Sequence, residues 1–399
     1  MRHLHRQLDR LAASPLRPGV LVSPWRQGPD SRPQRVLYRH HGACIRGDLQ
    51  LLETCPLNVL FVQPPAAHRV GGIDTALSGL AQAVAPADVH VERVETLHAD
   101  AAAHADLVHF HGLWERAHIS ARRRCVAANT PFLISPHGML EPWAFQHRGW
   151  KKWPYFHLIE RPSFKAAKAI LATSDAEATQ LARWFPRPQI RVLSLGGDLP
   201  PSGNRDTARG GIGVRPEELV ILFLSRCHEK KGLHLLIDAL PAAARAAGRS
   251  VRLLVVGDGD PAYVNPLRSA TTRWTGNLRC TWAGACWGQE KWRYLHAADL
   301  LCLPSFSENF GLAVLEALFA GTPVLTTTGT PWASLRGALP VETIPPTTKD
   351  LQTALARFLI QPPPTDAVRQ NTRSLAQAMF GWPALAPRYV ALYRELARA

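Results

Sequence analysis

The chain has 399 residues, 46% of them hydrophobic, and carries a formal net charge of +15 at pH 7. This length is enough for two domains with cores of their own, and the charge favours anionic partners: nucleotide diphosphates, anionic lipid surfaces or nucleic acid. No unbroken apolar run reaches membrane-spanning length, which argues against a transmembrane helix, and no helix-turn-helix, zinc-finger or RNP signature supports nucleic-acid binding.

The cysteines and the first residues indicate the compartment. The chain has seven cysteines, without C-x-x-C or zinc-ligand spacing, which favours buried, reduced thiols over a disulfide framework. The N-terminus is basic but lacks an apolar h-region, so it does not resemble a secretory signal. We therefore expect a cytoplasmic protein.

The predicted elements begin after an Arg- and Pro-rich extension. Residues 1–54 are weakly periodic, and we assign them no function. Leu57 to Gln63 (LNVLFVQ) predicts the first buried strand, and Asp74 to Val84 predicts the helix that follows it. Further strands are predicted at 89–94, 107–110, 132–135 and 170–173, with helical patterns between them. This alternation favours an open parallel sheet covered on both faces.

A second series of strands and helices follows a Gly- and Pro-rich linker at 196–213. Its predicted strands are 220–225, 251–257, 278–283 and 300–304, and its predicted helices are 233–247, 289–297 and 311–320. The last pattern, Trp382 to Leu396, is an amphipathic helix. Its stripe is too apolar to be exposed, so we expect it to pack back on the first series.

The predicted fold class is therefore α/β, with two Rossmann-like parallel-sheet domains facing one cleft. We expect an extension at 1–54, a first domain at 55–205, a second domain at 206–378 and a crossing helix at 379–399. Ligands of open α/β sheets bind outside the carboxyl ends of the strands. A site between the two domains follows from this rule.

The most informative segment runs from Ser305 to Val324 (SFSENFGLAVLEALFAGTPV) and holds two carboxylates, Glu308 and Glu316. A buried strand precedes it, and a helix is predicted to begin at Gly311. This geometry presents free backbone N–H groups to an anion. A diphosphate beside two carboxylates that can hold sugar hydroxyls describes a nucleotide-sugar site. The alternative is an ordinary strand–loop–helix unit with a surface glutamate.

This segment resembles the E-x7-E signature of retaining glycosyltransferases of the GT-B fold, family 4 (group 1). The resemblance implies that Glu308 positions the donor sugar and that Glu316 holds the nucleotide ribose. It also implies a donor-side second domain and an acceptor-side first domain. The remaining residues expected to bind the donor are Gly72, Asn309, Phe310, Gly311 and Leu312.

A basic segment follows the strand at 220–225. It is similar to the family's G-R-x-x-x-x-K-G motif, with Ser225 where a glycine is usual, and the resemblance places Arg226 and Lys231 on the donor phosphates. Fixed cations stabilise a leaving diphosphate whose negative charge grows. A solvated basic loop is the alternative.

His137 and Gly138 follow the strand at 132–135. Their position matches the family's histidine that hydrogen-bonds the donor sugar, and Met139 and Leu140 continue the family's G-M-L-x-P-W pattern. Gly72, with the preceding glycine, resembles the family's glycine pair, where backbone approaches sugar or phosphate closely. A satisfied loop histidine and a simple turn are the respective alternatives.

His109 and His111 share one strand face and raise the question of a metal. No carboxylate or third histidine lies at a supporting spacing, and the resemblance implies phosphate binding without a metal. We therefore expect no metal and no cofactor, the nucleotide sugar being a substrate. His111, with Gly112 and Trp114, is expected to line the acceptor side.

The segment Glu141 to Trp153 (EPWAFQHRGWKKW) mixes aromatic and basic residues. Such a mixture suits the headgroup zone of an anionic membrane, and a partly buried helix face explains it equally well. The residues concerned are Trp143, Arg148, Trp150, Lys151, Lys152 and Trp153. Peripheral attachment to the inner face of the cytoplasmic membrane is thus an open alternative to a purely cytoplasmic location.

The resemblance implies transfer of a sugar from a nucleotide donor to a saccharide or lipid-linked acceptor, in cell-surface or exopolysaccharide biosynthesis. The family's pattern offers no carboxylate placed as in retaining glycosidases, and the resemblance implies a front-face departure, in which the leaving phosphate oxygen takes the acceptor proton. A nucleotide-sugar 2-epimerase and an inactive sugar-nucleotide-binding protein remain alternatives. An NAD oxidoreductase is disfavoured, because no G-x-G-x-x-G follows the first strand.

Overall fold

The computed structural model describes residues 36–40, 43–47, 56–65, 71–142, 149–201 and 203–398. Two compact units divide the chain, Met1–Leu57 and Asn58–Ala399. In the first, β1 (Val36–His40) pairs antiparallel with β2 (Ala43–Gly47). The sequence did not predict this hairpin, and the rest of the extension expected at 1–54 lies outside the described residues.

The first six-stranded sheet has the order β4-β3-β5-β6-β7-β8, and its neighbours from β3 to β8 run parallel. The strands are β3 (Leu57–Val62), β4 (Val89–Val94), β5 (Leu107–His111), β6 (Phe132–Ser135), β7 (Ala169–Ala172) and β8 (Ile190–Val192). The helices are α2 (Gly71–Val84), α3 (Ala99–His104), α4 (Arg116–Ala128), α6 (Gly149–Tyr155), α7 (Arg161–Phe164) and α8 (Asp175–Leu181). Short helical turns are η3 (Ala85–Ala87), η4 (Phe156–Glu160) and η5 (Arg187–Gln189). We call these elements the first half.

The second sheet has the order β11-β10-β9-β12-β13-β14, the doubly wound arrangement of dinucleotide-binding folds. Its strands are parallel and comprise β9 (Leu219–Leu224), β10 (Val251–Val256), β11 (Leu278–Gly284), β12 (Leu300–Leu303), β13 (Val324–Thr327) and β14 (Val341–Ile344). The helices are α9 (Arg205–Gly211), α10 (Leu233–Ala247), α11 (Pro261–Thr272), α12 (Glu290–Ala297), α13 (Leu312–Phe319), α14 (Thr348–Leu359) and α15 (Asp366–Phe380). Two short turns are η6 (Glu229–Lys231) and η7 (Pro331–Leu335). We call these elements the second half.

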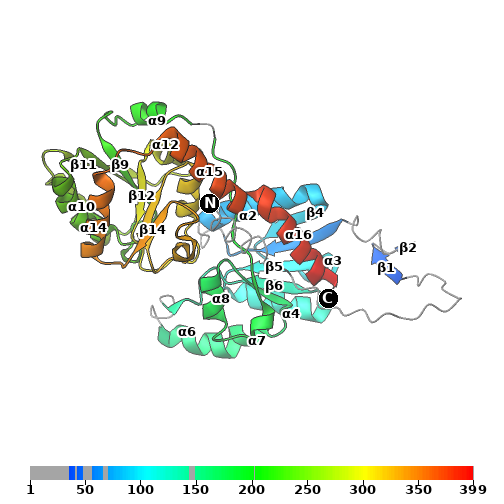
Figure 1. Cartoon of the computed structure of the whole chain (residues 1–399). Coiled ribbons are helices and arrows are strands. Elements are labelled where there is room, and N and C mark those ends of the chain that lie inside the picture. Colours follow the sequence, from blue (N-terminus) through cyan, green and yellow to red (C-terminus); the bar gives the residue numbers. More distant parts are fainter. Residues whose placement is uncertain are drawn as a thin grey trace. The chain divides into compact units, whose positions relative to one another are not determined.

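The two parallel sheets confirm the predicted α/β fold class (Figure 1). All six residues of β9 (LVILFL) are buried, as expected for a parallel strand with helices on both faces of its sheet. Within the two six-stranded sheets, the strands β8, β13 and β14 were not predicted. Each is short and includes charged or hydroxyl side chains (IRV, VLTT and VETI), so it lacks the continuous apolar run that marked the equally short β7 (AILA). Helix α2 begins at Gly71 rather than at the predicted Asp74.

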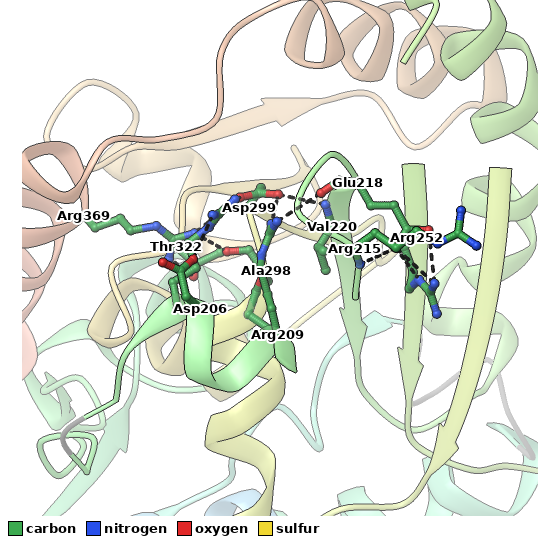
Figure 2. Close-up of polar contacts among 12 residues, drawn as sticks. Asp206, Arg209, Arg215, Glu218, Val220, Arg252, Ala298, Asp299, Thr322 and Arg369 are labelled. Carbon is green, nitrogen blue, oxygen red and sulfur yellow. Dashed lines mark hydrogen bonds and ion pairs between the residues drawn. The ribbon is translucent and has the colours of Figure 1, made fainter. Parts of the chain in front are cut away.

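The predicted linker at 196–213 is corrected by α9, whose residues pack into the second half. Arg209 forms a buried ion pair with Asp299, and Arg205 Nη2 lies 2.7 Å from the same carboxylate. Arg369 of α15 lies 3.6 Å from it, and Val220 N donates to it at 2.8 Å (Figure 2). These contacts depend on Asp299, about ninety positions away, so local composition could not reveal them.

A second buried carboxylate, Glu218, lies at the same edge of the sheet as Asp299 and its arginine partners. Glu218 accepts from Arg215 N at 2.8 Å and pairs with Arg252 at 3.0 Å (Figure 2). Asp299 and Glu218 immediately precede β12 and β9. This ionic layer therefore lies at the amino ends of the strands, opposite to the edge where ligands of such sheets bind.

The last helix, α16 (Trp382–Arg398), packs on the first half. It contacts α2, and Figure 1 draws the two side by side. Tyr393 Oη lies 3.0 Å from His109 Nδ1 on β5, and Tyr389 Oη donates to Ser194 O at 3.1 Å. The chain passes between the two halves twice, after β8 and after α15. These two passages contact each other, since Gly197 N donates to Phe380 O at 3.2 Å.

Candidate functional site

The loops that follow β9, β10, β12 and β13 pack against one another at the carboxyl edge of the second sheet. Cys227 N donates to Asp258 O at 2.7 Å, Phe306 N donates to Lys230 O at 2.9 Å, and Glu308 N donates to Gly329 O at 3.4 Å. The two segments expected to hold the donor, 226–231 and 308–316, therefore belong to one group of loops. Their meeting is a consequence of the parallel topology.

Lys231 and Glu308 form an ion pair at the centre of these loops. Lys231 Nζ lies 2.6 Å from Glu308 Oε1, and both side chains are largely buried. Ser305 Oγ donates to the same carboxylate oxygen at 2.8 Å. The structure thus holds the expected donor-sugar carboxylate and the expected phosphate cation in a fixed, partly desolvated geometry, where electrostatic interactions are stronger than in water.

Helix α13 begins beside this pair. Its N-cap, Gly311, has φ of +81° and makes no side-chain cap hydrogen bond. A residue other than glycine would be strained there. The helix N-terminus therefore remains available to an anion such as a phosphate.

The residues around Gly311 divide between packing and site. Phe310 is buried against Trp332 and Phe380, so its side chain belongs to the core and only its backbone can face a ligand. Leu312 lies against Gly72, where an added Cβ would be 3.1 Å from Leu312 Cδ1. Asn309 Oδ1 is buried and has no hydrogen-bond partner within the described part of the chain.

Glu316 pairs with a lysine that sequence reasoning missed. Lys291 Nζ, on α12, lies 2.7 Å from Glu316 Oε1. Burial raises the pKa of the Glu316 carboxyl, and Lys291 acts against that rise. The pair holds the Glu316 carboxylate in a mostly buried position. Neither sequence spacing nor composition links these residues.

Arg226 is placed differently from Lys231. Its side chain is exposed, and the structure gives it no ion pair with any described residue. It follows β9 on the same loop, so contact with a bound diphosphate remains a prediction. Lys231 is the member of the basic pair that already faces a carboxylate.

His137 lies at the carboxyl end of β6 in a left-handed conformation, with φ of +51°. It is buried, and its Nε2 lies 3.1 Å from His111 Nδ1. Burial lowers the pKa of His137 to about 4, so the ring is neutral near pH 7. His137 Nδ1 and His111 Nε2 have no partner among the described residues. A neutral imidazole with one such nitrogen suits hydrogen bonding to a sugar hydroxyl.

His137 is supported through His111 by His109 and Ser135 of the neighbouring strands. His109 Nε2 lies 2.7 Å from Ser135 Oγ, and the rings of His109 and His111 have centroids 3.9 Å apart. Burial lowers the pKa values of both histidines, and neighbouring histidine charges add to the effect. His109 is thus held between Ser135 of β6 and Tyr393 of α16. The sequence did not predict either contact.

Glu177 of α8 holds the turn after His137. Its Oε1 accepts from Gly138 N at 2.7 Å, and its Oε2 accepts from Thr173 N at 2.8 Å. Burial raises the pKa of this carboxyl to about 7, against the lowering effect of these hydrogen bonds. No motif pointed to Glu177, whose only signal is its position shortly after β7.

The two halves meet at the His137 turn and the Glu308 loop. A Cβ at Gly138 would lie 2.6 Å from Asn309 Cβ, so only glycine permits this approach. Glu141, in the first half, accepts from Ser307 Oγ at its Oε2 at 2.7 Å, and Lys230 Nζ lies 3.1 Å from the same oxygen. The expected histidine and the expected glutamate are thereby carried on segments in direct contact.

The aromatic and basic segment is described only in part. Trp150 is 76% exposed and Trp153 is 57% exposed, both on α6. Lys152 Nζ lies 5.9 Å from the ring centroid of Trp114. Trp143 and Arg148 lie outside the described residues, as does the side chain of Lys151. The described part of the segment therefore presents large aromatic side chains to solvent.

The described residues hold neither a metal-ligand cluster nor a membrane-spanning helix. Among the described residues, no group of three or more His, Cys, Asp or Glu side chains is arranged to hold a metal ion. Within the same part of the chain, no helix has both the length and the apolar character that a membrane span requires.

Family models match both halves. Residues 204–374 match the model described as Glycosyl transferases group 1, and residues 70–199 match that described as Glycosyltransferase Family 4. The group 1 match, 204–374, contains all strands of the second sheet. The Family 4 match, 70–199, contains β4 to β8 of the first sheet. The Ser305–Val324 segment and Lys231 lie in the group 1 match, and His137 lies in the Family 4 match.

Curated relatives carry related names. The chain is 29% identical over 248 residues to a D-inositol 3-phosphate glycosyltransferase of Saccharomonospora viridis, which covers 57% of this chain and 56% of the relative. It is 30% identical over 244 residues to the D-inositol 3-phosphate glycosyltransferase of Segniliparus rotundus. This match covers 57% of this chain and 52% of the relative. The chain spans about half the length of these curated relatives.

Solved structures share the fold. HepE of Anabaena in complex with UDP and glucose matches with a TM-score of 0.66 at 18% identity, over 85% of this chain and 100% of that chain. WaaG, a glycosyltransferase involved in lipopolysaccharide biosynthesis, matches with a TM-score of 0.59 at 18% identity, over 84% and 99%. These likenesses confirm the predicted glycosyltransferase (GT-B) fold.

Proposed function

We propose that this chain, both halves of which match glycosyltransferase models, is a retaining glycosyltransferase that moves a sugar from a nucleotide-sugar donor to an acceptor hydroxyl. The observation that carries the proposal is the Lys231–Glu308 pair, 2.6 Å apart beside the uncapped N-terminus of α13. A cation, a carboxylate and free helix amides together suit a sugar diphosphate.

In the proposed mechanism, the bond between the anomeric carbon and the diphosphate oxygen breaks while the acceptor oxygen bonds to the same face of that carbon. The acceptor proton passes to the departing phosphate oxygen. Lys231, Arg226 and the α13 N-terminus stabilise the charge that grows on the diphosphate. No metal or other cofactor is required in this scheme.

The remaining residues hold the donor. Glu308 orients the sugar and Glu316 accepts hydrogen bonds from the ribose. The neutral His137 hydrogen-bonds a sugar hydroxyl from the first half. Gly72 and Gly138 allow backbone to approach the ligand, and the buried Oδ1 of Asn309, which has no partner among the described residues, supplies one further acceptor.

Two alternatives within the fold are less well supported. A nucleotide-sugar 2-epimerase needs free acid and base carboxylates, whereas Glu141 and Glu177, the buried carboxylates that contact the His137 turn, already accept two or more hydrogen bonds each. An inactive sugar-nucleotide-binding protein would bind through the same Lys231–Glu308 pair, and the matches of both halves to glycosyltransferase models favour the enzyme over it. The reaction products distinguish the transferase from the epimerase, and the absence of turnover identifies an inactive protein.

The deciding experiment incubates the purified chain with UDP-, GDP- and ADP-sugars, with and without saccharide and lipid-linked acceptors. A transferase releases nucleoside diphosphate in proportion to glycosylated acceptor, and nuclear magnetic resonance of the product shows whether configuration is retained. An epimerised sugar nucleotide without transfer would replace the proposal by the epimerase, and tight binding without turnover would replace it by the inactive protein.

We further propose that the acceptor is presented at an anionic membrane surface in cell-surface polysaccharide assembly. Exposed Trp150 and Trp153 on a basic segment support this. The test is co-sedimentation with vesicles of phosphatidylglycerol and phosphatidylcholine. Trp150→Ala with Trp153→Ala should release the chain, whereas Trp287→Ala, at an exposed tryptophan of the second half, serves as the matched control. Equal binding by all variants would contradict the assignment.

A further inference from the structure

Glu141 is a buried carboxylate of the first half whose side-chain partners lie in the second half. It follows the His137 turn, and only 3% of its surface is exposed. Lys230 Nζ lies 3.1 Å from its Oε2, and Ser307 Oγ donates to the same atom at 2.7 Å. A buried carboxylate left without partners is strongly destabilising. The contact between the halves therefore determines how well Glu141 is satisfied.

The partners of Glu141 are the chain neighbours of the donor residues. Lys230 immediately precedes Lys231, and Ser307 immediately precedes Glu308. The two adjacent lysines point to different carboxylates: Lys231 to Glu308 within the second half, and Lys230 to Glu141 across to the first. Lys230 and Ser307 are thus direct chain neighbours of the two members of the donor-binding pair.

Glu141 also lies at the base of the His137 turn. Glu141 N donates to Gly138 O at 3.1 Å, and a Cβ at Gly138 would lie 2.9 Å from Glu141 Oε1. The same glycine approaches Asn309. One carboxylate thus joins the turn that carries His137 to the two loops that carry Lys231 and Glu308.

We propose that Glu141 is a positioning residue that aligns His137 with Glu308 by binding Lys230 and Ser307 whenever the two halves are in contact. The inference rests on the proposed function. When the halves separate, water solvates Glu141 and Lys230, so the pair favours the closed arrangement without contacting the substrate. Transfer rate should then depend on this pair, because alignment across the contact precedes chemistry.

The experiment uses Glu141→Gln, Lys230→Met and the reversed pair Glu141→Lys with Lys230→Glu. Each single change should lower kcat by at least about tenfold, as expected for truncation of a buried charged contact. The affinity for UDP by calorimetry should change less than twofold, because the nucleotide lies in the second half. The reversed pair should recover most of the lost kcat. Glu342→Gln, which breaks an exposed pair with Arg357, is the matched control.

A measurement without substrate separates this inference from the proposed function. Small-angle scattering of the ligand-free full chain should give a larger radius of gyration for Glu141→Gln and Lys230→Met than for wild type and Glu342→Gln. If wild type transfers no sugar, the proposed function fails while the scattering still tests the contact. Unchanged scattering and kcat in both single variants, or no recovery in the reversed pair, would overturn the positioning role.

Discussion

Lys231 Nζ lies 2.6 Å from Glu308 Oε1, although 77 positions separate the two residues in the chain. The pair places a cation and a carboxylate together beside the N-terminus of α13. Charges so arranged before the substrate binds need little reorganisation during the reaction, which is how electrostatic preorganisation accelerates transfer.

Replacing Glu308 by Gln should lower the transfer rate by at least about a hundredfold, the scale seen when one preorganised polar contact is lost. The shape of the side chain is kept, so the fold should remain intact. Steady-state kinetics with circular dichroism checks this. Glu395→Gln, at an exposed carboxylate of α16, is the control. Near-normal turnover in the Glu308 variant would contradict the assignment.

Lys231→Ala and Arg226→Ala should each weaken nucleotide binding and slow transfer together, because both cations are proposed to face a phosphate whose charge grows in the transition state. Calorimetry with UDP, GDP and ADP, followed by kinetics, measures both effects. Arg245→Ala, at an exposed arginine of α10, should change neither. Unchanged affinity and rate in both site variants would make the basic segment a solvated loop.

Lys291→Met should make donor binding more sensitive to acid. Burial raises the pKa of Glu316, and Lys291 opposes that rise, so removing the lysine raises the pKa further. In the proposed site the ribose hydroxyls donate to the ionised Glu316 carboxylate, so the affinity should fall as pH decreases, starting at a higher pH in the variant. Calorimetry from about pH 8 to about pH 5 tests this, with Lys349→Met on α14 as control. Identical pH profiles would remove Glu316 from the ribose site.

Transfer should survive an excess of EDTA, because Lys231, Arg226 and the α13 amides are proposed to stabilise the diphosphate. The measurement is initial rate before and after chelation, followed by addition of Mg²⁺ or Mn²⁺. Complete loss that either ion restores would contradict the proposed mechanism and would direct attention back to His109 and His111.

Deleting residues 382–399 should abolish transfer and lower the thermal midpoint, although every proposed donor-binding residue remains. The deletion removes buried Trp382, Tyr389 and Tyr393, and with them the contact of α16 with His109. Tyr393→Phe, which keeps the packing and loses the hydrogen bond, should retain a folded chain with a smaller loss. Full activity in the truncated chain would mean that α16 is a detachable tail.

Much of the fold was predictable because its signals are local. β9 is a continuous apolar run, and the helix predicted at 233–247 is α10 with the same bounds. The parallel topology then places Lys231 and Glu308 at one edge of the sheet, since each follows a strand. β13 and β14 were missed because threonine and glutamate interrupt their short apolar runs (VLTT and VETI), and α9 was missed because its arginines depend on the distant Asp299.

The amino-acid order sets which residue types follow which strands, and so which side chains are available to the candidate site. The partners of these side chains depend on the tertiary structure: Lys230 pairs with Glu141, 89 positions away, Lys291 with Glu316, and His109 with Tyr393, 284 positions away. Periodicity and propensity report on neighbours within a turn or two of helix or a few residues of strand. Pairings across loops depend on how whole elements pack, which no local pattern contains.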